Sequence, residues 1–356
     1  MKKKALIILP SYSVGGAEKV LLSYFKYFKS SKIELKLLVI NSKVSKSKFL
    51  NKKKIELNFS KFIYSLPTII KLLKKENYNF IISTFPHISA LILLTKYIKL
   101  HNCKVIIRQP NIIETSLTGT FKLFLLKHIY KKLIKYADAV IVTSNHMLKE
   151  AKKNKVLEKK IFFITNPIDL RKTRANIQPY RVKGEKIKLI FVGRLVYQKG
   201  IDRILYLFKK IKNLELLLIG DGIEKQKLQR TVKELKIENN VKFLGYKKKP
   251  FKYIAGADYF ILPSRWEGLP NCVIESLALG TPVIAFSEIK PLLDYKQNIK
   301  NKSLTLCDNL QSLELFLKSI RRRDDYKKPY LRKSFLVNYI TPKNYQSKIN
   351  NILLKI

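Results

Sequence analysis

The sequence predicts an α/β protein made of two doubly wound domains, each built on a parallel sheet. Three observations lead to this prediction. Short apolar runs rich in β-branched residues alternate with longer segments of helical period. Those runs lack the in-and-out alternation of a half-exposed strand, which indicates sheets covered on both faces. The 356 residues also exceed what one hydrophobic core usually serves.

The expected strands form two series separated by a polar stretch. The first series comprises residues 5–9, 34–40, 80–84, 104–108, 139–144 and 161–165. The second comprises residues 187–193, 214–220, 241–245, 258–263 and 282–286.

The polar stretch at 166–186 has the composition of a linker. We therefore place the domains at 1–170 and 171–341, with a final helix around 342–356 that could pack back on the first domain. In open parallel sheets, ligands bind outside the carboxyl ends of the strands. The site is thus expected in the loops directly after strands, at a cleft between two facing domains.

The composition is strongly basic, with 72 Lys+Arg against 25 Asp+Glu and a formal charge of +47. Such a surface attracts nucleic acid, anionic lipid or phosphorylated substrates. A general bias toward lysine at polar positions explains the count equally well. Three distant cysteines, Cys103, Cys272 and Cys307, suit neither a disulfide framework nor a paired metal site, and fit a reducing compartment. No apolar run approaches the ~20 residues of a membrane-spanning helix.

Several strand-end loops carry candidate binding residues. Gly15 and Gly16 precede a helix expected near Ala17, where backbone N–H groups can approach a phosphate, although a plain tight turn fits as well. Arg194 and Lys199 flank the loop after 187–193 and suit a diphosphate, but two cations are unremarkable in so basic a chain.

Two further loops follow strands in the second domain. Asp221-Gly222 is expected to cap the next helix, as an ordinary turn or as a ligand contact. In "SRWEGLPNCVIESLALGTPVIAF", Glu267 lies in a loop, Asn271 is the expected N-cap of a helix over 272–279, and Glu275 lies just past its first turn. Carboxylates there would accept hydrogen bonds from sugar hydroxyls, and the helix N-terminus would favour a phosphate.

The order of these segments resembles the retaining glycosyltransferases of family 4, which have the GT-B fold. The resemblance rests on "GGAE", "NPID", "VGRLVYQKGID", "IGDGIEKQKL", "FLGY" and "ADYFILPSRWEGLPNCVIESLALGTPVIA". It covers roughly residues 1–290 and is firm from 187 to 286.

This resemblance implies a role for each motif residue. Arg194 and Lys199 would bind the donor diphosphate and Glu267 the donor sugar, and these three are the catalytic candidates. Glu275 would hold the ribose hydroxyls, and Gly15 and Gly16 would close over the phosphates from the other domain. The remaining donor-side candidates are Gly193, Asp221, Tyr246, Gly268, Leu269, Pro270 and Asn271.

The sequence departs from the family pattern in two places. After the strand at 104–108, Gln109 stands where many relatives carry a histidine or an acid, and glutamine cannot act as a general base. His87, Arg108 and Asn111 remain as acceptor-side candidates, with a packed or solvated role as the alternative for His87. After 282–286, "SEIKPLLD" replaces the Gly-Gly-Pro-Glu turn of many relatives, which puts donor-sugar contacts there in doubt.

The sequence also bears on cofactors and surfaces. No Asp-x-Asp follows a strand in a suitable loop, so neither a metal nor another cofactor is implied. The segment 121–136 has helical spacing and carries a basic stripe with Phe121 and Phe124 toward its start. The stripe comprises Lys127, His128, Lys131, Lys132 and Lys135. An apolar face is expected opposite the stripe, comprising Leu126, Ile129, Tyr130 and Leu133. The stripe suits an anionic membrane surface, and a solvated helix face explains it equally well.

Together these features predict a retaining, hexosyl-type glycosyltransferase. It would move a sugar from a UDP- or GDP-linked donor to a saccharide or lipid-linked acceptor, in cell-surface polysaccharide or glycolipid synthesis. The expected location is the cytoplasm, peripherally on the inner face of the cell membrane. No nucleic-acid-binding pattern occurs, so nucleic acid is not an expected partner. The alternatives are another GT-B enzyme, such as a nucleotide-sugar epimerase or phosphorylase, and a non-catalytic polyanion-binding protein.

Overall fold

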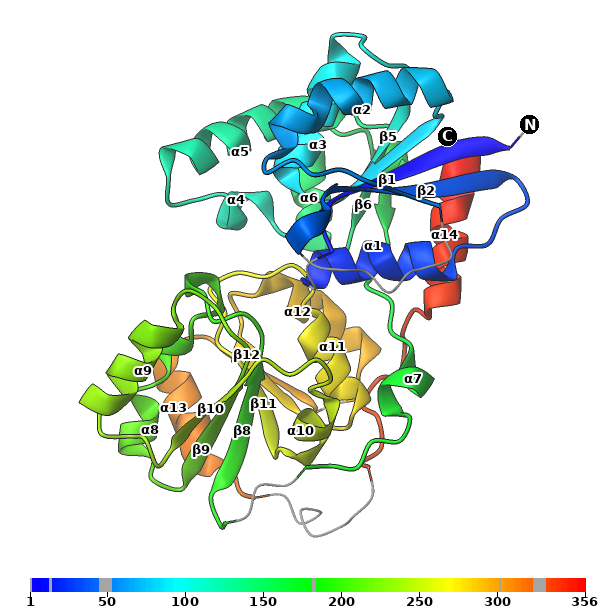
Figure 1. Ribbon diagram of the computed structural model, residues 1–356. Coiled ribbons are helices and arrows are strands. Elements are labelled where there is room, and N and C mark those ends of the chain that lie inside the picture. The colour runs from blue at the N-terminus through cyan, green and yellow to red at the C-terminus, as the bar shows by residue number, and fades with distance from the viewer. Residues whose placement is uncertain (1, 13–14, 45–52, 181–183, 301, 323–330) are drawn as a thin grey trace. The chain divides into compact units, whose positions relative to one another are not determined.

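The computed structural model describes residues 2–12, 15–44, 53–180, 184–300, 302–322 and 331–356. The chain divides into two compact units (Figure 1). Unit 1 comprises residues 1–167 together with 340–356, and unit 2 comprises residues 168–339. The first crossing between the units therefore lies three residues before the predicted boundary at 170/171.

Unit 1 is built on a seven-stranded sheet of order β3-β2-β1-β4-β5-β6-β7, in which every pair is parallel. The strands are β1 Lys3–Ser11, β2 Ile33–Asn41, β3 Lys54–Glu56, β4 Phe80–Ser83, β5 Lys104–Arg108, β6 Ala139–Val142 and β7 Ile161–Phe163. The helices are α1 Gly16–Tyr27, α2 Phe62–Glu76, α3 Pro86–Tyr97, α4 Ile113–Ser116, α5 Phe121–Leu133, α6 Asn145–Lys153 and α14 Pro342–Lys355. Short 3-10 turns are η1 Ser42–Val44, η2 Ile134–Tyr136 and η3 Glu158–Lys160.

The side chains of β1 alternate between two separate cores. Leu6 and Ile8 face the core under α2, α3, α5 and α6, whereas Ile7 and Leu9 face the core under α1 and α14. This alternation explains why the strand is apolar throughout, since both sheet faces are covered. The final helix packs beside α1, and the Tyr24 hydroxyl donates a 2.9 Å hydrogen bond to Asn350 (Figure 1).

Unit 2 is built on a six-stranded parallel sheet of order β10-β9-β8-β11-β12-β13. The strands are β8 Ile187–Val192, β9 Leu214–Ile219, β10 Val241–Gly245, β11 Tyr259–Leu262, β12 Val283–Phe286 and β13 Leu304–Cys307. The helices are α7 Leu170–Arg174, α8 Leu207–Lys210, α9 Lys225–Glu234, α10 Phe251–Gly256, α11 Asn271–Ala278, α12 Lys290–Tyr295 and α13 Leu310–Ser319. Short 3-10 turns are η4 Tyr197–Lys199, η5 Ile201–Arg203 and η6 Lys296–Asn298.

Both sheets contain a point at which the strand order reverses. In unit 1 it lies between β1 and β4, and in unit 2 between β8 and β11. Chain connections leave in opposite directions there, and ligands of open parallel sheets bind outside the carboxyl ends of strands at such a point. The loops after β1, β4, β8 and β11 are therefore the places to look for a site.

Candidate active site

The loops after β8 and β11 bring together residues that are far apart in the sequence. β8 pairs with both β9 and β11, so its carboxyl end lies at the reversal point of the unit 2 sheet. Arg194 follows β8 and is exposed, and Lys199 ends the turn η4. Glu267 follows β11. The loops predicted to hold a donor thus meet at one edge of one sheet.

Glycine lets the loops after β8 and β9 approach each other closely. Gly220 has a φ of +146°, and a Cβ atom there would collide with the carbonyl of Gly193. The amide of Leu195 donates to the Asp221 carbonyl at 2.9 Å, and the amide of Glu224 donates back to the Leu195 carbonyl at 3.0 Å. Gly193 therefore serves in the packing of the two loops.

Lys199 and Glu267 form an ion pair at the centre of this edge. Glu267 is only 7% exposed, and its carboxylate also accepts a 2.8 Å hydrogen bond from the Ser264 hydroxyl. The Gln198 amide nitrogen lies 3.5 Å from the second carboxylate oxygen. A buried carboxylate needs such partners, and these hold Glu267 in one orientation. The predicted diphosphate-binding lysine and the predicted sugar-binding acid are in direct contact.

Helix α11 begins one residue earlier than the sequence predicts. Asn271 is its first residue and not its N-cap, because Pro270 occupies the cap with φ −74° and ψ 121°. The Pro270 carbonyl already accepts the amides of Val273 and Ile274, at 3.1 and 3.4 Å. The fixed φ of proline presets the chain to enter the helix at this point.

Other predicted residues lie on the same helix and loop. Glu275 is half-buried on α11, four residues into the helix. Gly268, Leu269 and Pro270 are buried in the loop that leads to it.

Asp221 and Tyr246 lie in the loops after β9 and β10. Asp221 does not cap α9, which starts at Lys225 with Glu224 as its N-cap. Its carboxylate instead accepts the Gly222 amide at 2.8 Å and pairs with Lys225 at 3.2 Å. Tyr246 follows β10 and is 62% exposed, so its ring is available to a ligand.

In unit 1, Gly15 and Gly16 lie at the N-terminus of α1, with Gly15 as an extended N-cap. His87 lies in the first turn of α3 after β4 and is exposed. Although the residue is exposed as a whole, local desolvation of its ring and, to a smaller extent, the nearby charge of Lys122 lower the pKa of His87. These residues follow β1 and β4, which flank the reversal point of this sheet.

Arg108 ends β5 in a buried position. Its guanidinium donates to the Asn166 side chain at 2.6 Å and to the Thr84 hydroxyl at 3.3 Å, and burial lowers its pKa. These bonds tie the end of β5 to the end of β4 and to the "NPID" segment. Thr84 and Asn166 therefore occupy two of the hydrogen-bonding groups that the sequence assigned to an acceptor.

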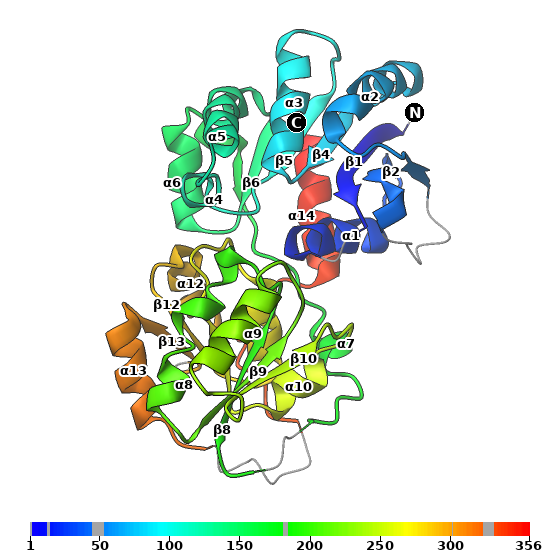
Figure 2. The same cartoon turned by 60° about the vertical axis from the view of Figure 1, so that its left-hand side comes forward.

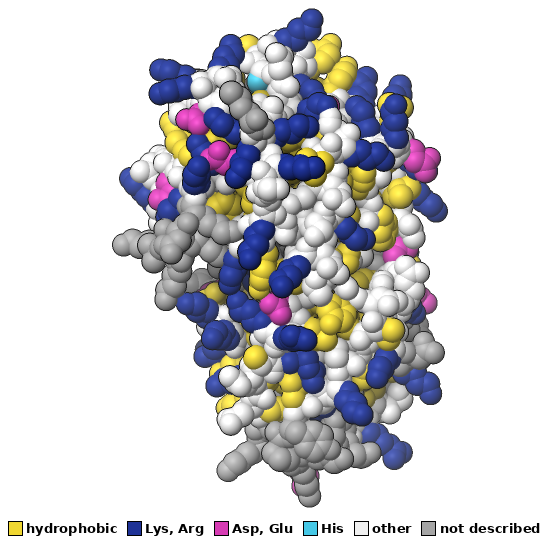
Figure 3. Space-filling view, turned by 90° about the vertical axis from the view of Figure 1, so that its right-hand side faces the viewer, with side chains coloured by type: hydrophobic (Ala, Val, Ile, Leu, Met, Phe, Trp, Pro, Cys, Tyr) yellow, Lys and Arg dark blue, Asp and Glu magenta, His cyan; other side chains and the backbone are white. Residues whose placement is uncertain are grey.

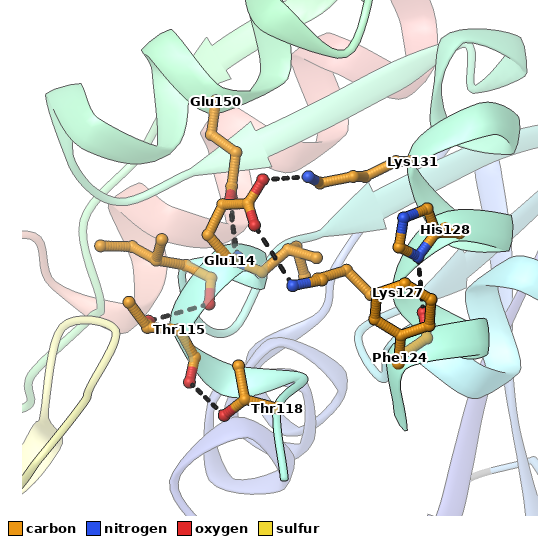
Figure 4. Close-up of polar contacts among 10 residues, drawn as sticks. Glu114, Thr115, Thr118, Phe124, Lys127, His128, Lys131 and Glu150 are labelled. Atoms are coloured by element: carbon orange, nitrogen blue, oxygen red, sulfur yellow. Dashed lines mark hydrogen bonds and ion pairs between the residues drawn. The ribbon is translucent and has the colours of Figure 1, made fainter. Parts of the chain in front are cut away.

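Glu150 of α6 organises the loop that contains Asn111. Its buried carboxylate accepts the Gln109 side-chain amide at 2.6 Å. It also accepts the backbone amides of Ile113 and Glu114, both at 2.9 Å (Figure 4). Gln109 also donates to the Asn111 carbonyl at 3.1 Å. Desolvation raises the pKa of Glu150 despite these bonds. Asn111 is thus held between α6 and α4.

The basic stripe predicted on α5 is only partly correct. Lys127 and Lys131 both pair with Glu114 of α4, and their side chains are 15% and 25% exposed (Figure 4). Tyr130 and Leu133 are buried as expected, but Ile129 is exposed. His128, Lys132 and Lys135 of the predicted stripe are exposed, and the same solvent-facing side of α5 also carries the apolar residues Phe121, Phe124, Leu125 and Ile129. Helix periodicity alone placed the boundary of the buried face incorrectly, because the position of α4 was not foreseeable.

Basic residues are spread over the surface. On the face drawn in Figure 3, lysine and arginine side chains are scattered over the whole face with few acids among them. Within the part of the chain that the structure describes, no helix has both the length and the apolar character needed to cross a membrane.

Models of known protein families match both units. The model of Glycosyltransferase Family 4 matches residues 14–172, and the model of Glycosyl transferases group 1 matches residues 172–323. An uncharacterized glycosyltransferase of Methanocaldococcus jannaschii is 36% identical over 212 residues, 56% of this chain and 52% of that protein. The match thus spans about half the length of this relative.

Two further proteins match nearly end to end. One is N-acetylgalactosamine-N,N'-diacetylbacillosaminyl-diphospho-undecaprenol 4-alpha-N-acetylgalactosaminyltransferase of Campylobacter jejuni. It is 26% identical over 351 residues, 93% of this chain and 94% of that protein. Among solved structures, Anabaena HepE in complex with UDP and glucose superposes with a TM-score of 0.78 at 16% identity, over 99% of this chain and 100% of HepE.

Proposed function

Because the chain belongs to glycosyltransferase family 4 and has the GT-B fold, we propose that it transfers a hexosyl group from a nucleoside-diphosphate donor with retention of configuration. The observation that carries the proposal is the meeting of Lys199 and Glu267 at the reversal point of the unit 2 sheet, beside Arg194 and α11. Strand ends at such a point, with cations, a buried acid and a helix N-terminus beside them, suit a sugar joined to a diphosphate.

The proposed roles follow from the chemistry of each group. Arg194 and Lys199 stabilise the negative charge that grows on the leaving diphosphate. Glu267 and Glu275 accept hydrogen bonds from hydroxyls, Glu267 from the donor sugar and Glu275 from the ribose. Lys199 then has two partners in the reaction, the Glu267 carboxylate with which it is paired and the leaving diphosphate.

Retention is consistent with the residues after β5. Gln109 has no proton affinity suited to a general base, and its amide already donates to Glu150. We propose that the departing phosphate oxygen takes the proton of the acceptor hydroxyl. The bond to phosphate lengthens first and charge develops at the anomeric carbon, while the new glycosidic bond forms on the same face.

Two relatives support a proposal for the donor and the acceptor. HepE has been solved with UDP and glucose, and the Campylobacter enzyme is named for a saccharide on diphospho-undecaprenol. We propose a UDP-linked hexose as donor, with a GDP-linked donor as the alternative. The proposed acceptor is a saccharide carried on a polyprenyl diphosphate, which places the protein in cell-surface glycan synthesis.

A lipid-linked acceptor requires that the enzyme reach a membrane surface. The exposed face of α5 is suited to attach there. Phe121 is 81% exposed and Phe124 52% exposed, and Lys122, Lys132 and Lys135 are exposed beside them. Aromatic and aliphatic groups flanked by lysines suit the boundary of an anionic bilayer. We therefore propose peripheral attachment at the inner face of the cell membrane through the outer face of α5, and not through Lys127 and Lys131.

The function is tested by incubating the protein with a panel of nucleotide sugars and measuring the released nucleoside diphosphate by mass spectrometry. We expect release from one donor, stimulated by a lipid-linked saccharide. Arg194→Ala and Lys199→Ala should each lower turnover by about two orders of magnitude, a typical loss for one electrostatic stabiliser. Near-parental turnover in both variants would remove the assigned site. Epimerised donor or a sugar phosphate as product would instead indicate the other GT-B activities.

A further inference from the structure

Two loops that supply the donor site are joined by a second set of contacts outside the Lys199–Glu267 pair. The first loop is the double turn η4–η5, residues 197–203, and the second is the loop 264–267 after β11. Gly200 separates the two turns with a φ of +64°, and a Cβ atom there would collide with the Pro263 carbonyl. The turn can therefore lie directly against the end of β11 only because residue 200 is glycine.

Arg265 and Asp202 form a two-pronged ion pair across these loops. Arg265 Nη2 lies 2.6 Å from Asp202 Oδ2, and Nη1 lies 2.9 Å from Oδ1. Nη1 also donates to the Tyr197 carbonyl at 2.8 Å, and the guanidinium carbon lies 3.8 Å from the centre of the Tyr197 ring. The hydrogen bonds from Arg265 are the main cause that lowers the pKa of Asp202. A planar guanidinium in this arrangement fixes direction as well as distance.

Two further hydrogen bonds join the same two loops closer to Lys199 and Glu267. The Arg265 amide donates to the Gln198 carbonyl at 2.8 Å, and the Gln198 side chain donates to the Trp266 carbonyl at 2.9 Å. Residues 198 and 266 directly precede Lys199 and Glu267. Each loop thus has its catalytic candidate one residue away from a contact with the other loop.

We propose that Arg265 and Asp202 are positioning residues for the donor site, whose paired side chains hold the Lys199 turn in register with the Glu267 loop. The inference rests on the proposed function of Lys199 and Glu267. Neither Arg265 nor Asp202 needs to touch the donor. Their effect is exerted through the placement of Lys199, which must reach the leaving diphosphate as charge develops on it.

The predicted signature is a loss of turnover that exceeds the loss of binding. Asp202→Asn and Arg265→Gln should each lower kcat about tenfold, because misplacement of a reacting group by ~1 Å costs up to a hundredfold and the Gln198 contacts limit the shift. The affinity for UDP, measured by calorimetry, should fall less than about threefold, since neither residue is proposed to touch the nucleotide. The double variant should be no worse than the poorer single variant, because both changes remove one interaction.

Two controls separate positioning from general loss of an ion pair. Arg265→Lys keeps the charge but not the fork, and should recover part of kcat. Lys210→Ala breaks the 3.0 Å pair between Lys210 and Glu314 in the same unit and should leave kcat unchanged. If the Asp202 and Arg265 variants keep kcat within about twofold of the parent while Lys199→Ala loses it, the pair is only a surface contact and the proposal is wrong.

Failure of the proposed function would be seen in the parent protein itself, as no UDP binding and no turnover with any donor. Hydrogen exchange then still tests whether the Arg265–Asp202 pair holds the two loops together. Exchange that rises in both 197–203 and 264–267 in the Arg265→Gln variant supports it. Exchange that is unchanged in either loop overturns it.

Discussion

Unit 2 contains a cluster of one buried acid and two lysines. Replacing the acid and replacing the buried lysine should lower the free energy of unfolding by different amounts. Glu215 of β9 is 3% exposed and pairs with Lys188 of β8, whose side chain is 2% exposed, and with Lys242 of β10, at 2.7 Å and 48% exposed. Burial alone would raise the pKa of Glu215, but hydrogen bonds from Lys188 and Lys242 outweigh it and the pKa is lowered. The acid therefore has two cations, whereas the partner seen for the Lys188 ammonium among the described residues is Glu215.

Replacing the acid should cost far more than replacing the lysine. Glu215→Leu leaves Lys188 charged and buried, and breaking a buried pair in this way costs about 3–5 kcal/mol. Lys188→Met leaves Glu215 paired with Lys242 and adds apolar packing, so we expect a loss of roughly 1–2 kcal/mol. The double variant should return to within about 1 kcal/mol of the parent, because no unpaired charge is left in the core.

The assay can observe unit 2 alone. Trp266 is the single tryptophan of the chain, so its fluorescence during urea unfolding reports on this unit. With an m value of about 2 kcal/mol per molar urea, Glu215→Leu should lower the midpoint by roughly 2 M. Lys242→Ala, which removes the exposed partner, is the control and should cost less than about 1 kcal/mol. Equal and small shifts for Glu215→Leu and Lys188→Met would refute the reasoning.

Three other predictions follow from the site and its surroundings. Glu275→Gln should weaken binding of the free nucleoside diphosphate in calorimetry, whereas Glu267→Gln should mainly slow transfer; equal loss of affinity in both variants would contradict the division of roles. Phe121→Ser with Leu125→Ser should abolish most cosedimentation with anionic liposomes at physiological salt, and parental pelleting would argue against the outer face of α5. The raised pKa of Glu150 means that the folded state binds its proton more tightly than the unfolded state, so this group stabilises the fold as pH falls from neutrality toward its ordinary value of 4.5. Glu150→Gln should remove that component, seen as a flatter dependence of the urea midpoint on pH between 7 and about 5.

Much of the fold follows from the pattern of apolar runs. All eleven expected strands occur. Nine of them lie inside the sheets, where coverage on both faces leaves an uninterrupted apolar signature, and two, β7 and β10, are edge strands that were also predicted. The two strands that were not predicted, β3 and β13, lie at sheet edges. β3 is three residues long within a lysine-rich stretch, and β13 has half-buried residues at its centre. An edge strand is covered less completely, so its sequence carries less of the signal.

The site was predicted at the level of loops but not of partners. The chain position of Lys199 and Glu267 followed from the motifs, yet their contact joins residues 68 positions apart. Gln198, Ser264 and the Arg265–Asp202 pair were not predicted to act there, although all four lie in the quoted motifs. Polar residues next to a predicted site residue in two facing loops would have been the available signal. Periodicity also failed on α5, where the partner of its lysines is a single acid on a four-residue helix.

The charge of this protein is best understood from its acids. With 25 acids against 72 cations, each buried carboxylate has many possible partners. In the structure, buried carboxylates bind several groups at once and hold them in place. Asp258 accepts the Lys188 amide at 2.8 Å, Glu150 gathers the amides that begin α4, and Glu267 holds Lys199 and Ser264. Replacing one of the lysines scattered over the surface removes one of many weak, screened charges. An acid lost from the interior strands a cation or several amides, so sensitivity to substitution should follow the acids rather than the lysines that dominate the composition.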